Sequence, residues 1–267
     1  MTDAAPTRLG VLGWPVGHSR SPAMHNAALR EMGLPGWHYQ LLPAAPDELA
    51  AITAGLPGAG FRGANVTIPH KVAALELCDS VSAGAGQIGA VNTLTFEPDG
   101  SVRGDNTDAP GFLASLPQSP AAGSTAMVLG AGGVAAAVVW ALRSVGVDVS
   151  IWNRTGARAV EMARLFDATA VDEPISAGML VNCTSAGLSG DPFETLPLKR
   201  AALGEYSTVA DLVYHDGDGP LLLAAAEAGA ATVDGIEVLV QQGALALQQW
   251  TGAEPPVEVM RQAALGA

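Results

Sequence analysis

The 267-residue chain has few basic side chains. Lysine and arginine together number 13 against 26 aspartates and glutamates, which gives a formal net charge of -13. A surface of that sign repels phosphate backbones and anionic lipid, and this argues against nucleic acid or a membrane as partners. If the ligands are themselves anions, the few basic side chains must be placed where those ligands bind.

Cysteine is also scarce. Cys78 and Cys183 both lie in apolar sequence, and no second pair exists to complete a metal site. We interpret both as buried thiols. The N-terminus lacks the apolar core of a signal peptide, and no apolar run is long enough to span a bilayer. We therefore expect a soluble cytoplasmic protein that holds no metal.

Apolar residues are abundant, at 49%, and they form short strands that alternate with longer helical patterns. This alternation predicts βαβ units and an α/β fold. Ser21 is the expected N-cap of the first helix, Pro69 is expected to open a later one, and Asp99-Gly100 is typical of a hairpin turn. The other elements expected in the first half are strands at 8–12, 37–42 and 63–68 and a helix at 47–55.

The sequence indicates two domains. A stretch rich in Pro, Ser, Gly and Ala at 117–125 predicts a linker or loop before a new strand, and we place a domain boundary near Asp108. Strands and helices then alternate to about Gly235, after which the pattern is mainly helical. We expect one domain from residues 1–108 and 236–267, and another from residues 109–235.

The strongest local signal follows the strand at 126–129. It is Gly-x-Gly-x-x-Ala, which leads into an alanine-rich helix. The glycines permit a tight turn and close approach of the backbone to a pyrophosphate, while the helix N-terminus supplies N–H groups and partial positive charge. The strand before and the helix after distinguish it from a glycine-rich turn without a ligand. The dinucleotide-binding residues expected here are Gly130, Ala131, Gly132, Gly133 and Val134.

The end of the next strand, at 148–152, indicates which dinucleotide is bound. An NAD enzyme usually has a carboxylate about twenty residues beyond the first glycine, for the ribose 2′-hydroxyl. This chain has Asn153, Arg154 and Thr155 there, with Arg158 one helical turn after Arg154. Two guanidiniums suit a 2′-phosphate, whereas a carboxylate would repel it. The pattern favours NADP over NAD, and the alternative is an ordinary solvated start of a helix.

Nicotinamide chemistry also needs a group that moves a proton. No Tyr-x-x-x-Lys occurs, no Cys/His cluster could hold a catalytic zinc, and the five histidines are scattered. The remaining candidates are polar residues at the ends of expected elements in the first half, where open α/β sheets bind ligands. They are Ser19 and Ser21, whose hydroxyls before a helix suit a carboxylate, the strand 65–71 and the cluster 105–108. Taken singly, Lys71 could be a solvated lysine and Asp108 a helix cap.

Together these segments resemble the shikimate dehydrogenase family, in the same order and over nearly the whole chain. Residues 13–26, GWPVGHSRSPAMHN, look like the family's N-terminal loop, whose two serines hold the substrate carboxylate. The resemblance gives that role to Ser19 and Ser21. Residues 65–71 look like the strand that carries the catalytic lysine, which implies Lys71 as that lysine and Thr67 as a substrate contact.

Three further matches complete the site that the resemblance implies. Asn92, in Gly-Ala-Val-Asn-Thr, matches an asparagine that binds ring hydroxyls, and Gln242 matches a glutamine that reaches back to substrate. Asp108 matches the catalytic aspartate, which contacts substrate as Lys71 does. The Asn-Arg-Thr stretch is similar to the family's NADP signature. The further cofactor contacts implied are Thr184, Ser185, Leu212, Tyr214 and Gly235.

The family implies a reversible, NADPH-dependent reduction of 3-dehydroshikimate to shikimate, in the biosynthesis of chorismate and the aromatic amino acids. It also implies an N-terminal α/β substrate domain, a Rossmann-type NADP domain, and C-terminal helices that return to the substrate domain, as a monomer or homodimer. The chain departs from the family pattern at 215–220 and at Glu237-Val238, both near the expected nicotinamide.

Two alternatives remain open. A quinate/shikimate dehydrogenase would share most of the site, but its NAD-using members favour an acidic residue near position 153, where this chain has asparagine. A non-catalytic NADP-binding paralogue would be expected to have lost the Lys71 and Asp108 pair.

Overall fold

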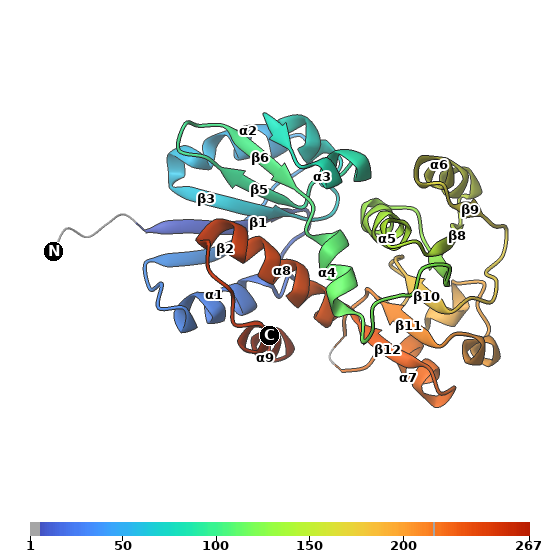
Figure 1. The fold of residues 1–267 in the computed structure, drawn as a ribbon. Coiled ribbons are helices and arrows are strands. Elements are labelled where there is room, and N and C mark those ends of the chain that lie inside the picture. The colour runs from blue at the N-terminus through green and yellow to red at the C-terminus, as the bar shows by residue number, and fades with distance from the viewer. Residues whose placement is uncertain (1–5, 216) are drawn as a thin grey trace. The chain divides into compact units, whose positions relative to one another are not determined.

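The computed structural model describes residues 6–215 and 217–267, which form an α/β fold with two compact units (Figure 1). One unit comprises the described residues up to Thr107 together with Leu239–Ala267, and the other comprises Asp108–Val238. The α/β fold class expected from the alternation of strands and helices is confirmed. Residues 1–5, part of the expected N-terminal segment, and Asp216, part of the departure at 215–220, lie outside the described residues.

The first unit is built on a mixed sheet with the strand order β2-β1-β3-β5-β6-β4. Strand β1 pairs in parallel with β2 and β3, whereas β5 runs antiparallel to both β3 and β6. The predicted hairpin around Asp99 is therefore confirmed. The elements of this part of the first unit, in chain order, are β1 (Thr7–Gly13), α1 (Ser21–Glu31), β2 (Trp37–Pro43), α2 (Leu49–Gly55), η1 (Pro57–Ala59), β3 (Phe61–Val66), η2 (Ala73–Leu77), β4 (Ser80–Val81), α3 (Ala83–Ile88), β5 (Thr93–Phe96) and β6 (Val102–Asp105).

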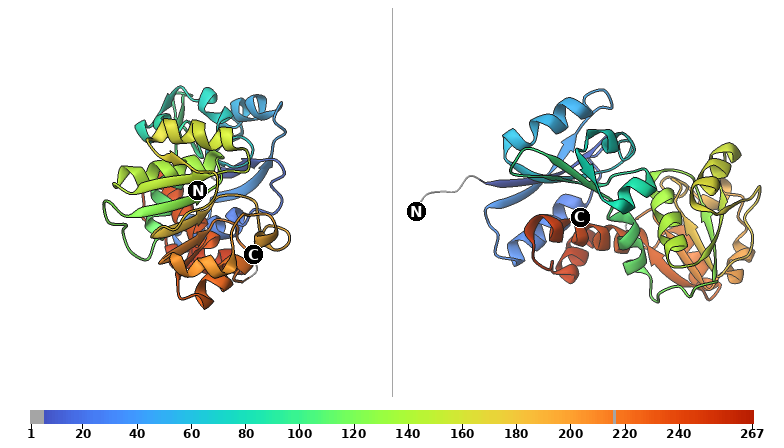
Figure 2. Two further views of the ribbon diagram at one scale, coloured as in Figure 1. Left: turned by 90° about the vertical axis from the view of Figure 1, so that its right-hand side faces the viewer. Right: turned by 45° about the horizontal axis from the view of Figure 1, so that its top comes forward.

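The C-terminal segment packs on this first unit. Helix α8 (Gly235–Thr251) begins in the second unit and continues into the first, and α9 (Val257–Leu265) lies beside α1 (Figures 1 and 2). The indole of Trp250, on α8, donates to the Leu94 carbonyl on β5 at 3.0 Å. Such a close approach of a helix to a sheet needs a small residue beneath the ring, and Gly63 on β3 supplies it, because a Cβ there would overlap the indole.

Replacement of Gly63 with alanine is expected to destabilise the protein by about 1–3 kcal/mol, the usual cost of overpacking a core. The added methyl group forces Trp250 away from the Leu94 carbonyl. Chemical denaturation of the purified variant measures the change. Gly36→Ala is the matched control, because a Cβ at position 36 meets no atom within 4 Å. A stability for Gly63→Ala equal to that of the control would contradict the close packing of α8.

Two helix starts differ from the sequence expectation. The N-cap of α1 is Arg20, not Ser21, and the Ser21 N–H donates to the Ser19 hydroxyl at 3.3 Å. No helix begins at Pro69, because His70 is held in a turn: its N–H donates to the Thr67 carbonyl and its ring nitrogen bonds the Ala44 carbonyl at 2.8 Å. The 3-10 helix η2 follows only at Ala73.

The second unit is a parallel sheet with the strand order β12-β11-β10-β7-β8-β9. Counted from β7, this is the Rossmann order 3-2-1-4-5-6, whose switch point lies between β7 and β10. Its elements are α4 (Asp108–Ser115), β7 (Thr125–Leu129), α5 (Gly133–Ser144), β8 (Asp148–Trp152), α6 (Gly156–Phe166), β9 (Thr169–Ala170), β10 (Met179–Asn182), η3 (Pro192–Glu194), η4 (Arg200–Glu205), β11 (Thr208–Asp211), α7 (Pro220–Glu227) and β12 (Ala231–Asp234).

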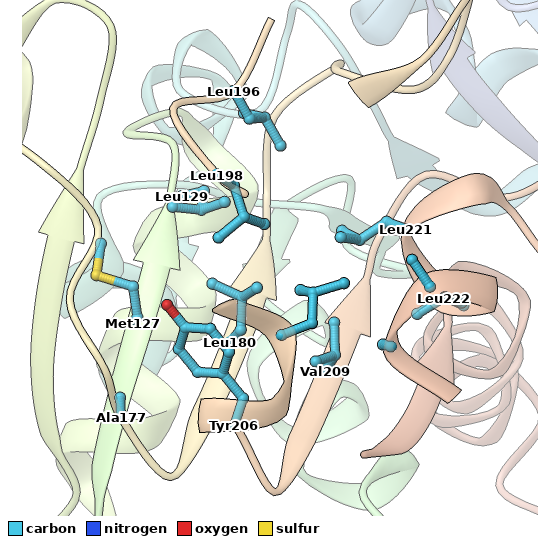
Figure 3. Close-up of a cluster of buried hydrophobic side chains, with 13 residues drawn as sticks. Met127, Leu129, Ala177, Leu180, Leu196, Leu198, Tyr206, Val209, Leu221 and Leu222 are labelled. Carbon is cyan, nitrogen blue, oxygen red and sulfur yellow. The ribbon is translucent and has the colours of Figure 1, made fainter. Parts of the chain in front are cut away.

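One face of this sheet carries a core shared with α7 and the 3-10 segments. Leu180 and Val209 on neighbouring strands meet Leu221 on α7, with Tyr206 beside them (Figure 3). This core buries one face of the strands, and polar residues begin at their carboxyl ends, with Asn182 on β10 and Asp211 on β11. In the described residues, no helix is both long enough and apolar enough to span a membrane.

Candidate functional site

A single row of residues crosses the second sheet at its carboxyl edge. The strand registers place Trp152, Leu129, Asn182, Asp211 and Asp234 side by side, one at the end of each of five parallel strands. The segments that directly follow this row contain every cofactor-binding residue predicted from the sequence. Loops after parallel strands are where open α/β sheets bind ligands.

The glycine-rich turn after β7 fits a pyrophosphate. Gly130 has φ 112°, in a region that favours glycine, and a Cβ there would lie 3.1 Å from the Cys183 carbonyl. Gly132 is the N-cap of α5 and has open space where a side chain would be. No side chain caps α5 and its first turn has no acidic residue, so its first N–H groups can receive a phosphate.

The segment after β8 presents the two arginines. Arg154 and Arg158 are exposed, and neither makes an ion pair within residues 6–215 and 217–267. Between them, Thr155 is the N-cap of α6, whose first turn has no acidic residue. The Asn153 amide donates to the Thr155 carbonyl at 2.9 Å, which orders the turn. These groups can hold a phosphate at the edge of the sheet.

The loops after β10 and β11 are held to each other by a buried polar pair. The Asn182 amide donates to the Asp211 carboxylate at 2.9 Å, and its oxygen accepts from the Thr184 hydroxyl at 2.7 Å. Burial raises the pKa of the Asp211 carboxyl to about 6, although hydrogen bonds from Val213 and Asn182 and the nearby His215 act in the opposite direction. Thr184 is half-buried and Ser185 is exposed.

The start of α8 lies close to the loop after β11. A Cβ on Gly235 would be 2.6 Å from the Leu212 carbonyl, so only glycine permits this approach. The Asp234 carboxylate accepts from the Glu237 N–H at 2.9 Å and caps the helix. Leu212 and Tyr214, in the loop, are half-buried. Glu237, at one of the departures from the family pattern, is thus part of an ordinary helix start.

The first unit gathers the predicted substrate residues at one edge of its sheet. Ser19 lies in the loop after β1, Ser21 begins α1, and the segment after β3 carries Thr67 and Lys71. Asn92 precedes β5, and because β5 runs antiparallel to β3, its start lies at the same edge. Ser21 and Asn92 are buried, whereas Ser19, Thr67 and Lys71 are half-buried.

Asn92 is the centre of a buried hydrogen-bond network. Its oxygen accepts from the Thr107 N–H at 2.7 Å and from the Thr93 hydroxyl at 2.9 Å. Its amide donates to the Gln242 side chain at 3.3 Å, which brings α8 to the same edge of the sheet. The Gln242 amide in turn donates to the Leu239 carbonyl at 2.7 Å. Both amide side chains are therefore fixed in orientation.

Asp108 follows this network directly along the chain. It is the first residue of α4, it is buried, and its neighbour Thr107 is anchored on Asn92. The unit boundary falls between Thr107 and Asp108.

Tyr39 and Asn65 belong to this network but were not assigned roles from the sequence. The Tyr39 hydroxyl donates to the Asn65 side-chain oxygen at 2.8 Å and hydrogen-bonds Ser21. The Asn65 amide donates to the Asn92 carbonyl and the Thr93 hydroxyl. Tyr39 thus links the serine loop to the asparagine network, and burial raises the pKa of its hydroxyl. No local motif indicates this role, since Tyr39 lies in an ordinary strand sequence, next to His38 and two residues after Trp37.

Both cysteines are free thiols and are half-buried rather than fully enclosed. Burial raises the pKa of Cys78 to about 11 and that of Cys183 further still, so neither is an activated nucleophile. In the described part of the chain, no three His, Cys, Asp or Glu side chains converge on a point where a metal could bind.

The fold and the two polar edges define a class: an α/β protein with a Rossmann-type dinucleotide unit and a second unit that gathers hydroxyl, amide and ammonium groups. Family models for the shikimate dehydrogenase substrate binding domain and the shikimate 5′-dehydrogenase C-terminal domain match residues 11–94 and 235–265. A shikimate dehydrogenase (NADP(+)) of Methylobacterium radiotolerans is 45% identical, over 96% of this chain and 95% of the relative. One of Acidiphilium cryptum is 46% identical, over 93% and 92%.

Solved structures agree with this likeness. A shikimate dehydrogenase of Aquifex aeolicus has a TM-score of 0.89 at 36% identity, covering 98% of this chain and 99% of its own. A shikimate 5-dehydrogenase of Thermus thermophilus, in complex with NADP(H) and shikimate, has a TM-score of 0.85 at 41% identity, covering 97% and 98%. This chain belongs to the shikimate dehydrogenase family, as the sequence motifs predict.

Proposed function

We propose that this protein is a shikimate dehydrogenase, which reversibly reduces 3-dehydroshikimate to shikimate with NADPH in chorismate and aromatic amino acid biosynthesis. The proposal rests on one observation. In each unit, polar residues that match the family's motifs lie together at one edge of the sheet. We propose residues 1–108 and 236–267 as the substrate domain and residues 109–235 as the NADP domain.

The substrate assignment is supported by the chemistry of the first edge. Ser19 and Ser21 precede or begin α1, whose first turn has no acidic residue, so their hydroxyls and the helix N–H groups suit the substrate carboxylate. Asn92, Gln242 and Thr67 offer amide and hydroxyl groups to the hydroxyls of the ring. We assign these residues, with Lys71 and Asp108, to substrate binding.

The cofactor assignment is supported by the fit of the second edge to NADP. Gly130 and Gly132 leave space for a pyrophosphate at the start of α5, and the exposed arginines after β8 suit a 2′-phosphate. The further contacts that we propose lie in the same turns and in the neighbouring loops. They are Ala131, Gly133, Val134, Asn153, Arg154, Thr155, Arg158, Thr184, Ser185, Leu212, Tyr214 and Gly235.

When bound, NADPH supplies the hydride for the C3 ketone. Lys71, as an ammonium, would donate a proton to the ketone oxygen or stabilise the negative charge that develops there. We propose Asp108 as the second catalytic residue, which orients the lysine. The serines and Asn92 hold the ring in place. No metal is needed, because the ammonium supplies the positive charge.

The test is an assay of purified protein with shikimate and NADP, in which the absorbance of NADPH measures the reaction. Parallel reactions with quinate and with NAD separate the proposed activity from that of a quinate/shikimate dehydrogenase. Turnover with shikimate and NADP far above the other three combinations is the expected result. NADP binding without turnover of shikimate or quinate would instead support a non-catalytic paralogue.

Arg154→Ala and Arg158→Ala are each expected to lower the preference for NADP over NAD by about 10- to 100-fold, the effect of a lost charge-assisted hydrogen bond. The ratio of kcat/KM values for the two cofactors measures this preference. Arg164→Ala is the matched control, because Arg164 is exposed on α6, the helix that also contains Arg158, and lies beyond its first turn. An unchanged ratio in both variants would refute the 2′-phosphate assignment.

We also propose a cytoplasmic enzyme, monomeric or homodimeric, whose partners are its small-molecule substrate and NADP. The free state of both cysteines is in keeping with a reducing compartment.

A further inference from the structure

The Asn182 side chain has a hydrogen-bond partner for every donor and acceptor it carries. Its amide donates to the Ala186 carbonyl at 3.1 Å and to Asp211 at 2.9 Å. Its oxygen accepts from the Thr184 N–H at 3.1 Å and from the Thr184 hydroxyl at 2.7 Å. These bonds fold the loop at 183–187 around one asparagine, so the orientation of that amide determines where the loop lies.

Asp211 determines that orientation. An ionised carboxylate only accepts hydrogen bonds, so the Asn182 NH₂ group must face it and the Asn182 oxygen must face Thr184. The same carboxylate oxygen accepts from the Val213 N–H at 3.2 Å and so turns the chain after β11. One carboxylate therefore connects the loop after β10 to the loop after β11.

The location of this carboxylate is costly for stability. Asp211 is 1% exposed, and among the described residues its second oxygen is buried without a hydrogen-bond partner. Burial raises the pKa of the carboxyl to about 6. A side chain that served only to fill space at the end of β11 would be apolar, like Val209 on the same strand. The position of Asp211 therefore points to a role for its acceptor oxygen.

We propose that Asp211 is a positioning residue for the cofactor: through Asn182 and the Val213 N–H, it fixes the loops at 183–187 and 212–215 in the arrangement that receives NADP. Asp211 itself does not contact the dinucleotide in this proposal. The inference rests on the proposed function, because it concerns the NADP site of that enzyme.

The experiment compares wild type, Asp211→Ala, Asp211→Asn and Val209→Ala. For each, direct titration gives the affinity for NADP, initial rates give the KM values for NADP and shikimate, and thermal unfolding gives the stability. Asp211→Ala removes the acceptor, whereas Asp211→Asn keeps one oxygen in place. Val209→Ala weakens the same strand from within the hydrophobic core and leaves the polar pair intact.

In Asp211→Ala, the Kd and KM for NADP are expected to rise about tenfold, the effect of one hydrogen bond of typical strength, while the KM for shikimate stays within about twofold. Asp211→Asn should restore NADP binding to within about threefold of wild type. Val209→Ala should lower the unfolding temperature and leave both KM values unchanged. If Asp211 had a merely structural role, its replacement would not raise the KM for NADP while leaving the KM for shikimate nearly unchanged.

The proposal is overturned if folded Asp211→Ala binds NADP as wild type does, or if both KM values rise together. If Asp211→Ala does not fold, Asn182→Leu tests the same interaction. It removes the hydrogen bonds from Asn182 to Asp211 and to the loop at 183–187, and it keeps the side-chain volume nearly constant. If the wild type binds NADP but does not oxidise shikimate, the proposed function is wrong and the proposal for Asp211 is not affected. The NADP titrations of the variants then decide the role of Asp211.

Discussion

Lys71→Ala is expected to lower kcat for shikimate oxidation by about 10²- to 10⁴-fold, the usual contribution of a positioned general acid or base. The change removes the ammonium that we assign to the ketone oxygen. It keeps the Lys71 backbone carbonyl, which accepts from the Val91 N–H at 2.8 Å, so the turn should persist. The affinity for NADP should not change, since the residues assigned to the dinucleotide belong to the second unit.

The chain offers a matched control for this variant. Lys199 is its only other lysine, and it is exposed in the second unit, before η4. Lys199→Ala should retain full activity, so stopped assays of both variants at saturating substrate separate the role of one ammonium from a general loss of positive charge. Near-normal turnover of Lys71→Ala would refute the proposed acid and, with it, the mechanism.

The sequence predicted those structural features of the candidate site that depend on local rules. A turn with φ 112° at Gly130 requires glycine, and an uncapped helix start requires a ligand or water for its N–H groups. Both constraints act within a few residues, so they leave a recognisable motif. The same holds for the family's short motifs, whose order identified the family.

The sequence did not predict the contacts that hold those motifs in place. Tyr39 and Asn65 are 26 residues apart, and Asn92 and Gln242 are 150 residues apart. Such pairs arise from strand order and register, which periodicity alone does not specify. The turn at His70 has the same origin, because its ring bonds the Ala44 carbonyl on a different segment and the expected helix at Pro69 does not form.

A buried histidine that packs against Tyr39 makes the stability of the protein depend on pH. His25, on α1, is completely buried and stacks on Tyr39 with ring centroids 4.1 Å apart and planes within 8°. Among the described residues neither of its ring nitrogens has a hydrogen-bond partner. Burial lowers the pKa of His25 from 6.5 to about 3, because the charged imidazolium would lose its hydration there without gaining a partner.

The sign of the effect follows from the lowered pKa. The unfolded chain binds a proton at His25 below pH 6.5, whereas the folded protein binds it only below about pH 3, so protonation favours unfolding throughout that interval. The stability that His25 contributes is complete above pH 6.5 and is lost as the pH falls toward 3. Between pH 7 and pH 4 this loss amounts to about 3 kcal/mol, at 1.36 kcal/mol per pH unit.

His25→Leu is therefore expected to lose about 3 kcal/mol less stability between pH 7 and pH 4 than wild type, because leucine fills the same space and binds no proton. Urea unfolding at both pH values measures the difference, and using the difference cancels any change in packing that the substitution causes. His38→Leu is the matched control for replacing a histidine with leucine, because His38 is exposed on β2, next to Tyr39. Equal losses for His25→Leu and wild type would mean that the imidazole takes up its proton inside the folded protein, and that the stack on Tyr39 opens to admit water.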